Sequence, residues 1–451
     1  MDQHERDQRA ARAEVFVADL EAKGVAAVAM TYVDTSGITR VKAVPPARLP
    51  HAAAWGIGMS PVFDAFLVDD SIVTGRFAGG PVGDLRLHPD LDRLVALSAP
   101  AGWAWTPADR FDQEGEPHPL DSRALARREA ERLAERGMAV LAAFEIEWAV
   151  SVGGGDEFTP GCQGPAYAMS RITEQSAYLR DLLGALRDHG VTVVQIHPEY
   201  AAGQYEVSMA PEEPVAAADT AILVRETVRA VSHAHGLRAS FSPKVLAGGV
   251  GNGGHIHLSL WRGDRNLMSG GDGPYGMGTE GEAFSAGILA RLPALLAVGA
   301  PAVASYLRLI PSHWAGAYAC WGLENREAAL RFVRGAAGER ERAANLEVKS
   351  FDPAANPYLA MAALLAAGRV GIADGAALPA PVEADPVGLD AIPRLPTSLE
   401  EAVAAFEAEP ALKEALGEAV IDTVAAVRRG EIALFAGLDE EEIAARSRWK
   451  Y

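Results

Sequence analysis

The chain has 451 residues, of which 49% are hydrophobic and 22% are charged, a composition typical of a globular protein with a large core and unlike that of a disordered or fibrous chain. Asp and Glu number 60 against 41 Lys and Arg, which gives a formal net charge of −19 at pH 7. This charge repels phosphate backbones and anionic lipid surfaces on average, so we expect neither nucleic acid nor a membrane as a partner.

The first predicted elements are a helix and a hairpin. Residues 1–14 are strongly charged where a signal peptide would need an apolar stretch, and the apolar spacing predicts an amphipathic helix to about Lys23. Residues 26–32 and 38–44 have the composition of strands, and the Asp-Thr-Ser-Gly sequence at 34–37 is a turn signal. We therefore expect a hairpin after the first helix.

A polar, Pro-rich stretch at residues 106–122 predicts a domain boundary, with one domain over residues 1–107 and a second over residues 108–451. In the second domain helices alternate with strands, which is typical of an α/β or α+β layer. The predicted helices cover residues 121–137, 174–189, 281–304 and 354–373, the last closing near Gly368; the strands cover residues 138–150 and 191–197; and a helical tail over residues 397–428 precedes a polar, acidic end.

Two observations bear on the compartment. The two cysteines, Cys162 and Cys320, are too few for a disulfide framework, which favours reduced thiols in a cytoplasmic protein. Residues 292–307 form the longest apolar run, but they contain prolines and fall short of the roughly 20 residues needed to cross a bilayer. We expect no membrane span.

Carboxylates recur in two of the motifs. In Phe144-Glu-Ile-Glu-Trp148 the residues alternate, so Glu145 and Glu147 would project from one face of a strand while the apolar residues pack on the other. In residues 197–206, Glu199 and Glu206 flank a glycine that can supply a tight bend, as in a hairpin. Each motif alone also fits a simpler structure, a solvated strand face or a polar turn, but together they could hold a divalent cation.

A third motif combines glycines with histidines. The Gly-rich residues 248–254 expose backbone amides, and the alternation that follows places His255, His257 and Ser259 on one strand face. Such a histidine pair is either structural or in contact with a ligand.

The remaining motifs are cationic. Arg308, Arg326 and Arg331 are basic residues in an acidic chain, and the last two lie in an apolar setting that would demand a partner such as a phosphate or a carboxylate. Surface solubility is the alternative for any one of them. Glu347 and Lys349 would share one face of a later strand, which pairs an acid with a base.

The order of these motifs resembles the glutamine synthetase family over nearly the whole chain, and the run Asn356-Pro-Tyr-Leu359 is especially specific. The variant Trp314-Ala-Gly-Ala-Tyr318, with residues 324–331, resembles the synthetase-like branch that includes actinobacterial γ-glutamylethanolamide synthetases. Ammonia-using members carry a glutamate where this chain has Trp314. They also have an arginine in place of Lys349 and an asparagine in place of Val250.

The resemblance implies an α+β fold with a small N-terminal β-grasp domain and a large catalytic domain built on a curved antiparallel sheet. It implies a homo-oligomer of two stacked hexameric rings. The implied reaction is ATP-dependent ligation of an amine to the γ-carboxylate of glutamate through γ-glutamyl phosphate, with two or three Mg²⁺ or Mn²⁺ ions. Ethanolamine is the leading acceptor, and a polyamine or another monoamine comes next; an ammonia-using synthetase and a non-catalytic scaffold are the further alternatives.

The resemblance also implies roles for individual residues. Glu147, Glu199 and Glu206 would bind one metal, and Glu145, His255 and Glu347 the second. The α-carboxylate of the amino acid would be bound by Arg308 and Gly251, and the phosphoryl group by Arg326, Arg331 and Lys349. The nucleotide would be bound by His257, Ser259 and Arg331. The amine would be bound by Tyr167, by Trp314 and by Asp34 of a neighbouring subunit. The indole of Trp314 could cover an alkyl amine or contact its cation, or it could fill core volume.

Overall fold

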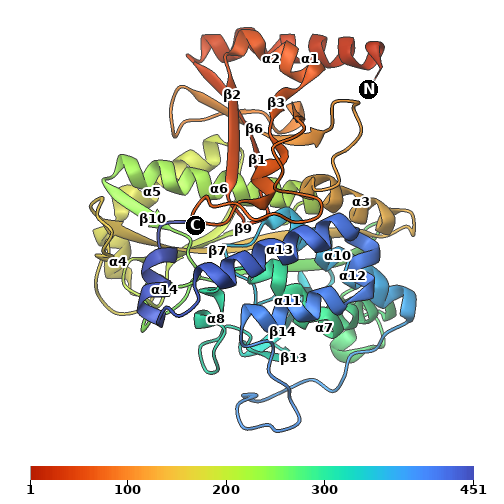
Figure 1. Ribbon diagram of the computed structural model, residues 1–451. Helices are drawn as coiled ribbons and strands as arrows, with labels where there is room; N and C mark the ends of the chain where they lie inside the picture. Colours follow the sequence, from red (N-terminus) through yellow and green to blue (C-terminus); the bar gives the residue numbers. More distant parts are fainter. Residues whose placement is uncertain (1) are drawn as a thin grey trace.

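The computed structural model describes residues 2–451. The N-terminal domain, red to orange in Figure 1, is a six-stranded sheet in the order β2-β1-β6-β4-β3, with β5 paired to β6. Its strands are β1 (Ala27–Val33), β2 (Thr39–Val44), β3 (Ile57–Met59), β4 (Leu85–Pro89), β5 (Val95–Ala96) and β6 (Trp103–Phe111), and its helices are α1 (Gln3–Ala22) and α2 (Leu49–Trp55), with the 3-10 turns Pro46–Arg48, Pro61–Ala65 and Leu91–Arg93.

The predicted hairpin is present as the antiparallel pair β1 and β2. Asp34 stabilises its turn by accepting a hydrogen bond from the Ile38 backbone N–H at 2.9 Å. Gly37 has φ +82° and lies against the Ala354 carbonyl, so both the conformation and the space exclude a side chain. This turn is one of the places where the N-terminal domain meets the catalytic domain. β6 extends beyond residue 107 to Phe111, so the first sheet passes the expected boundary.

The catalytic domain contains a nine-stranded sheet in the order β13-β14-β15-β11-β7-β9-β8, with β10 paired to β7 and β12 to β11. Its pairs are antiparallel, as expected, except β13 and β14 at one edge, which run parallel. The strands are β7 (Ala139–Val152), β8 (Val193–Pro198), β9 (Gln204–Met209), β10 (Leu237–Ser240), β11 (Gly254–Arg262), β12 (Arg265–Asn266), β13 (Tyr318–Leu323), β14 (Ala328–Val333) and β15 (Asn345–Val348).

Helices pack on this sheet and bury its apolar face, which carries Trp148, Tyr205 and Ile256. Figure 1 shows the C-terminal helices, in blue, side by side across the domain. The helices are α3 (Ser122–Ala134), α4 (Met169–Glu174), α5 (Ser176–Asp188), α6 (Pro214–Ala234), α7 (Thr279–Gly299), α8 (Ser305–Arg308), α9 (Arg340–Ala343), α10 (Pro357–Asp374), α11 (Leu399–Ala408), α12 (Pro410–Leu416), α13 (Glu418–Leu434) and α14 (Glu440–Ser447), with a 3-10 turn at Pro274–Gly276.

Two helix ends differ from the sequence prediction. α10 does not close near Gly368 but continues to Asp374, where Gly375 takes a left-handed conformation with φ +59°. Gly368 lies inside this helix, and a glycine is needed there because the ring of Phe284 occupies the space of a Cβ. The polar, acidic end forms α14, whose start is stabilised by a capping box between Asp439 and Glu442.

By length and composition, α7 could cross a membrane, and 72% of its most apolar window is buried inside the protein. It packs against α10 and α11. Its apolar character is therefore that of a core helix.

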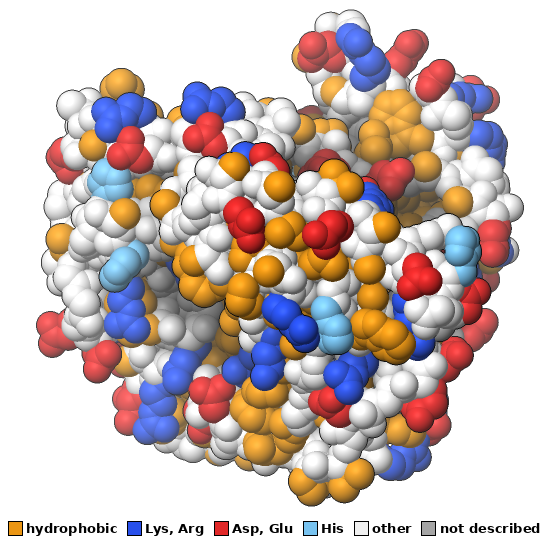
Figure 2. All heavy atoms as spheres, turned by 90° about the horizontal axis from the view of Figure 1, so that it is seen from above, with side chains coloured by type: hydrophobic (Ala, Val, Ile, Leu, Met, Phe, Trp, Pro, Cys, Tyr) orange, Lys and Arg blue, Asp and Glu red, His pale blue; other side chains and the backbone are white. Residues whose placement is uncertain are grey.

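The face drawn in Figure 2 carries acidic and basic side chains interspersed with apolar ones.

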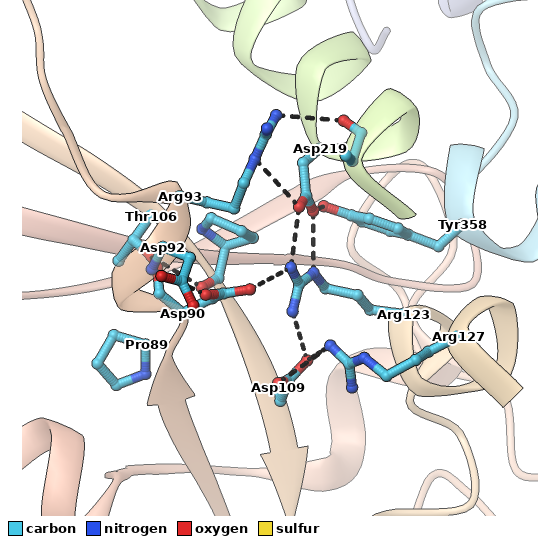
Figure 3. Close-up of polar contacts among 12 residues, drawn as sticks. Pro89, Asp90, Asp92, Arg93, Thr106, Asp109, Arg123, Arg127, Asp219 and Tyr358 are labelled. Carbon is cyan, nitrogen blue, oxygen red and sulfur yellow. Dashed lines mark hydrogen bonds and ion pairs between the residues drawn. The ribbon is translucent and has the colours of Figure 1, made fainter. Parts of the chain in front are cut away.

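A network of buried ion pairs joins the two domains (Figure 3). Arg123 of α3 donates two hydrogen bonds of 2.9 Å to Asp219 of α6, and it also reaches Asp90 at 2.6 Å and Asp109 at 2.7 Å in the N-terminal domain. The Tyr358 hydroxyl donates to Asp219 at 2.8 Å. One guanidinium therefore connects the N-terminal sheet with two catalytic-domain helices.

Candidate active site

Sheet register brings the first carboxylate group together. Glu147 on β7 lies opposite Glu206 on β9, and Glu206 lies opposite His197 on β8. His197 approaches Glu206 at 3.0 Å and Glu199, just beyond β8, at 3.4 Å. The period of two along each strand directs these side chains to the face opposite Trp148 and Tyr205. Three strands thus supply one row of ligands.

A second row lies on the adjoining strands. His255 on β11 pairs in register with Glu145 on β7, and its ring nitrogen Nδ1 lies 2.9 Å from the Glu145 carboxylate. Two residues further, His257 lies opposite Glu347 on β15, which in turn lies opposite Arg331 on β14. The sequence prediction that these residues share one surface agrees with this register.

Three overlapping groups of side chains have potential ligand atoms within 4.8 Å of one another. They differ in membership from the sets carried over from the family, because His197 joins a group and Glu147 is in none of them. The three groups are Glu145, His257 and Glu347; Glu145, Glu206 and His255; and His197, Glu199 and Glu206.

The electrostatics of the first row fit a bound cation. Burial, together with the charges of Glu199 and Glu206, raises the pKa of Glu147 to about 8. Burial, with the charges of Glu145 and Glu199, raises the pKa of Glu206 to about 7, against the lowering effect of His197. Carboxylates held together this closely repel one another, and a divalent cation would remove the repulsion. The donor set of carboxylates and imidazoles suits Mg²⁺ or Mn²⁺.

The second row is balanced by cationic side chains. The pKa of Glu347 is lowered to about 2, because Lys349, His257 and His255 outweigh the effect of burial. The Lys349 ammonium donates to Glu347 at 3.1 Å, and Arg331 donates to the other oxygen at 3.1 Å. Burial lowers the pKa of His255 to about 4, so its imidazole is neutral at pH 7 and can act as a ligand.

Arg308 and Gly251 lie together beside this row. A Cβ at Gly251 would come within 2.6 Å of the Arg308 side chain, so only glycine allows this approach. Arg308 Nη2 donates to the Lys349 carbonyl at 3.0 Å and lies 3.2 Å from His255. Its Nη1 is buried and has no hydrogen-bond partner among residues 2–451. A buried donor without a partner is costly, so this atom suits an anionic group of a substrate.

Gln204 was not singled out from the sequence, although it precedes Glu206 by two residues on the same strand face. Its side-chain amide donates to Glu147, the Gly251 carbonyl and Asn252, each at 2.9 Å. The period of two along β9 was the signal that could have found it. Asn345, which contacts His257 at 2.9 Å, carried the same signal, because it precedes Glu347 by two residues on β15. Glu324, which pairs with Arg331 at 2.6 Å, lies just beyond β13 and carried none.

Tyr167 reaches the first row from the segment before α4. Its hydroxyl donates to Glu199 at 2.8 Å, and its ring lies 5.8 Å from that of His197. The residue has φ +56°, a conformation that costs free energy in a tyrosine, and half of its surface is exposed. It therefore borders the cluster from the solvent side.

Trp314 is 56% exposed, which excludes the alternative that it fills core volume. It lies in a loop that leaves α8 just after Arg308 and returns at Gly316, where a Cβ would come within 3.1 Å of Lys349. Both ends of this loop thus adjoin the candidate site. The indole is available to a ligand.

Three other residues are placed differently from expectation. Arg326 is exposed in the turn between β13 and β14, so the apolar setting inferred for it is wrong. The Ser259 hydroxyl is engaged within its own strand, because it accepts a hydrogen bond from the Trp261 indole at 2.8 Å. Asp34 is completely buried, and its carboxylate is engaged by Arg40 at 2.7 Å. An enclosed carboxylate has no free face for an amine, so within its own chain Asp34 holds the hairpin turn.

The sequence model of the protein family described as "Glutamine synthetase, catalytic domain" matches residues 119–444 of this chain. The chain belongs to the glutamine synthetase family. It is 55% identical to "Gamma-glutamylpolyamine synthetase GlnA3" of Streptomyces coelicolor, over 98% of this chain and 97% of the relative. It is 34% identical to the glutamine synthetase of Thermotoga maritima, over 71% and 73% of the two chains. The resemblance inferred from motif order is thereby confirmed at the family level.

Solved structures agree with this assignment. One described as a "novel glutamine synthase homolog" superposes with a TM-score of 0.86 at 36% identity, covering 95% of this chain and 99% of the other. A second, "GmaS/ADP complex-Conformation 1", has a TM-score of 0.82 at 27% identity, covering 93% and 96%. The expected α+β, glutamine synthetase-like fold is confirmed. This member of the family is an ATP-dependent carbon–nitrogen ligase, and enzymes of the family use divalent metal ions and bind small-molecule substrates.

Proposed function

We propose that this ligase joins a polyamine to the γ-carboxylate of glutamate, with ATP activating that carboxylate as γ-glutamyl phosphate. The observation that carries the proposal is 55% identity, over 98% of the chain, to a relative named for a polyamine substrate. That relative favours the polyamine alternative over ethanolamine, our leading expectation from the sequence. The presence of Trp314, where ammonia-using members have a glutamate, agrees with an organic amine.

Two or three Mg²⁺ or Mn²⁺ ions would be held by the two rows of ligands. When bound, such ions offset the negative charge that gathers on a transferring phosphoryl group. The first row would supply Glu147, Glu199 and Glu206 with His197, and the second would supply Glu145, His255 and Glu347. Arg331 and Lys349, which both pair with Glu347, would add two positive charges beside the phosphoryl group. Arg326 would join them only if its exposed turn folds inward.

Glutamate would bind at Arg308. The unpartnered Nη1 of this buried guanidinium can donate to the α-carboxylate, beside the Gly251 backbone. His257 and Ser259 would lie toward the nucleotide, on the strand that carries His255. These roles come from the family motifs; the contacts of Arg308 support its role, whereas the Ser259 hydroxyl already accepts a hydrogen bond from Trp261.

The amine would enter between Tyr167 and Trp314. Glu199, to which Tyr167 donates, offers negative charge to a cationic amine, and the exposed indole offers a face for its alkyl chain or a second ammonium. A polyamine carries several ammonium groups, so both contacts can be used at once. An ammonium ion could use only the contact with Glu199.

We further propose that the active assembly is two stacked hexameric rings in the cytoplasm, as expected from the family resemblance. In such rings the β1–β2 turn of one subunit would lie at its neighbour's site. Asp34 would act there by holding the turn through Ile38 and Arg40, because its carboxylate is enclosed.

The test is phosphate release by purified protein with glutamate, ATP and a panel of amines. We expect spermidine or putrescine to exceed ethanolamine, and ethanolamine to exceed ammonium, with no release by the Glu147→Ala variant. Ethanolamine above every polyamine would replace the proposed acceptor. Preferential use of ammonium would make the protein an ammonia-assimilating synthetase, and absence of release with every amine would favour a non-catalytic scaffold.

A further inference from the structure

The loop that carries Trp314 has an unusual backbone. In this segment, residues 309–317, both Ser312 and Trp314 have positive φ angles, +60° and +52°. Neither is a glycine, and side chains rarely adopt this conformation because it costs of order 1–3 kcal/mol per residue. Two such residues in one short loop require a specific contact that compensates for the cost.

Glu327 supplies that contact. It lies at the end of the β13–β14 turn, immediately before β14, and its side chain is 6% exposed. Its Oε1 accepts a hydrogen bond from the Trp314 backbone N–H at 2.7 Å. Burial raises the pKa of Glu327, whereas the N–H groups of Trp314 and Ser312 oppose that shift. The positive φ of Trp314 thus accompanies a hydrogen bond from its amide to a buried carboxylate.

The ends of the 309–317 loop are held independently of its tip. Arg394 donates to the carbonyls of Leu309 and Ala317, at 3.1 Å and 3.0 Å, and so ties the two ends together. Glu327 is the contact to the tip, since it binds the amide of Trp314 itself. Removing Glu327 would leave the loop closed at its base and free to change at the indole.

We infer that Glu327 is a positioning residue for amine selection: it holds the 309–317 loop so that Trp314 presents its indole to the amine. This inference rests on the proposed function for the identity of the substrate, but the loop contact itself does not. The carboxylate acts through the hydrogen bond that its Oε1 accepts from the Trp314 amide, while its Oε2 is buried and accepts no hydrogen bond from residues 2–451.

The test compares Glu327→Ala with Glu327→Gln, which keeps an oxygen acceptor but removes the charge. Glu383→Ala is the matched control, because Glu383 also accepts a hydrogen bond, from the Tyr275 hydroxyl at 2.9 Å, but does not contact the loop. Hydrogen exchange of a peptide covering residues 309–317 reports the loop without any substrate. In Glu327→Ala we expect the Trp314 amide to exchange at least about tenfold faster, the factor expected for loss of one charge-assisted hydrogen bond.

In kinetics, the KM for the polyamine should rise about tenfold in Glu327→Ala, the same factor, whereas the KM values for ATP and glutamate should stay within about twofold. Glu327→Gln should keep both the exchange rate of the Trp314 amide and the KM for the polyamine close to those of the unmodified protein. Glu383→Ala should resemble the unmodified protein in both. If Glu327→Ala fails to fold by its melting curve, Glu327→Asp replaces it, since the shorter carboxylate withdraws from the loop.

Three results would overturn the inference: unchanged exchange at Trp314 in Glu327→Ala, a parallel rise of all three KM values, or a Gln variant as impaired as the Ala variant. The last would indicate that the negative charge itself is used. If no polyamine is turned over by the unmodified protein, the proposed function fails, but the exchange measurement still decides whether Glu327 holds the loop.

Discussion

At the scale of single residues, the site concentrates negative charge that the fold does not neutralise by itself. Glu147 has pKa about 8 and Glu206 about 7, both raised by burial and by neighbouring carboxylates. Glu347 shows the opposite, with its pKa lowered to about 2 beside Lys349 and two histidines. The first row, with Glu147 and Glu206, therefore favours binding of a cation from solution. In the second row, cationic side chains of the protein already neutralise part of the negative charge.

Glu147→Ala and Glu206→Ala should each abolish turnover while leaving the fold intact. A missing ligand leaves phosphoryl charge unneutralised, whereas the remaining carboxylates are relieved of repulsion. Mg²⁺ or Mn²⁺ should raise the Tm of the unmodified protein, because an ion that binds only the native state stabilises it, and this rise should be lost in both variants. The exposed Glu131→Ala on α3 is the control. Near-normal activity in either site variant would contradict the metal assignment.

The metal effect should depend on pH. Because the pKa of Glu147 is raised from 4.5 to about 8, folding favours its protonated form, and its contribution to stability declines as pH rises through this window. A divalent cation needs the deprotonated ligand, so its stabilising effect should grow over the same window. The Mn²⁺-induced rise in Tm should be small at about pH 5.5 and large at about pH 8.5. A rise independent of pH would show that these carboxylates are not the ligands.

Trp314→Ala should raise the KM for the amine far more than that for ATP or glutamate. The indole is 56% exposed, so the free energy of unfolding should change by no more than about 0.5 kcal/mol, unlike that of a core tryptophan. Trp55→Ala, at a tryptophan 46% exposed on α2, is the control for a general effect of losing a surface indole. A large loss of stability without any change in amine preference would contradict the pocket assignment.

At the scale of secondary-structure elements, the position of the N-terminal sheet depends on α3. Arg123 of this helix connects Asp219 of α6 with Asp90 and Asp109 of the other domain, and all four side chains are mostly buried or half-buried (Figure 3). Breaking a buried ion pair leaves an uncompensated charge in the interior. The network therefore holds the two domains in one arrangement.

Arg123→Ala should lower the free energy of unfolding by about 3–5 kcal/mol, because the buried Asp219 would lose both hydrogen bonds from this guanidinium and keep only Tyr358 at 2.8 Å and Arg93 at 3.5 Å. Arg127→Ala on the same helix removes a pair with Asp109 whose arginine is 39% exposed, and it should cost less than about 1 kcal/mol. Urea denaturation of both variants measures the difference. Equal losses would mean that the buried network contributes no more than the exposed pair.

At the scale of the whole molecule, the site is expected to need a second subunit. Mixing inactive Asp34→Ala protein with inactive Glu147→Ala protein should restore some activity in hybrid rings, because some sites would combine an intact turn with intact metal ligands. Light scattering and native mass measurements would establish subunit exchange. With exchange confirmed, an inactive mixture would show that each site is built from one chain and that Asp34 serves only its own fold.

Local patterns in the sequence determined the face on which most candidate ligands lie. Alternation with a period of two predicts that Glu145 and Glu147 share a face, and likewise His255 and His257, because a strand's geometry depends only on its own backbone. The turn at residues 34–37 and the alternation of helices and strands were predictable for the same reason. The order of motifs was sufficient to predict the family, which the comparisons confirm.

The tertiary structure alone decided which strands are neighbours and in what register. Glu147 meets Glu206, and His257 meets Glu347, across pairs separated by dozens of residues, and no local pattern encodes such a pairing. Burial was equally unpredictable: Asp34 is enclosed, Arg326 is exposed, and Trp314 projects from a loop held by Glu327. Exposure depends on what the rest of the chain places over a residue, so the same side chain can be a core filler or the wall of a pocket.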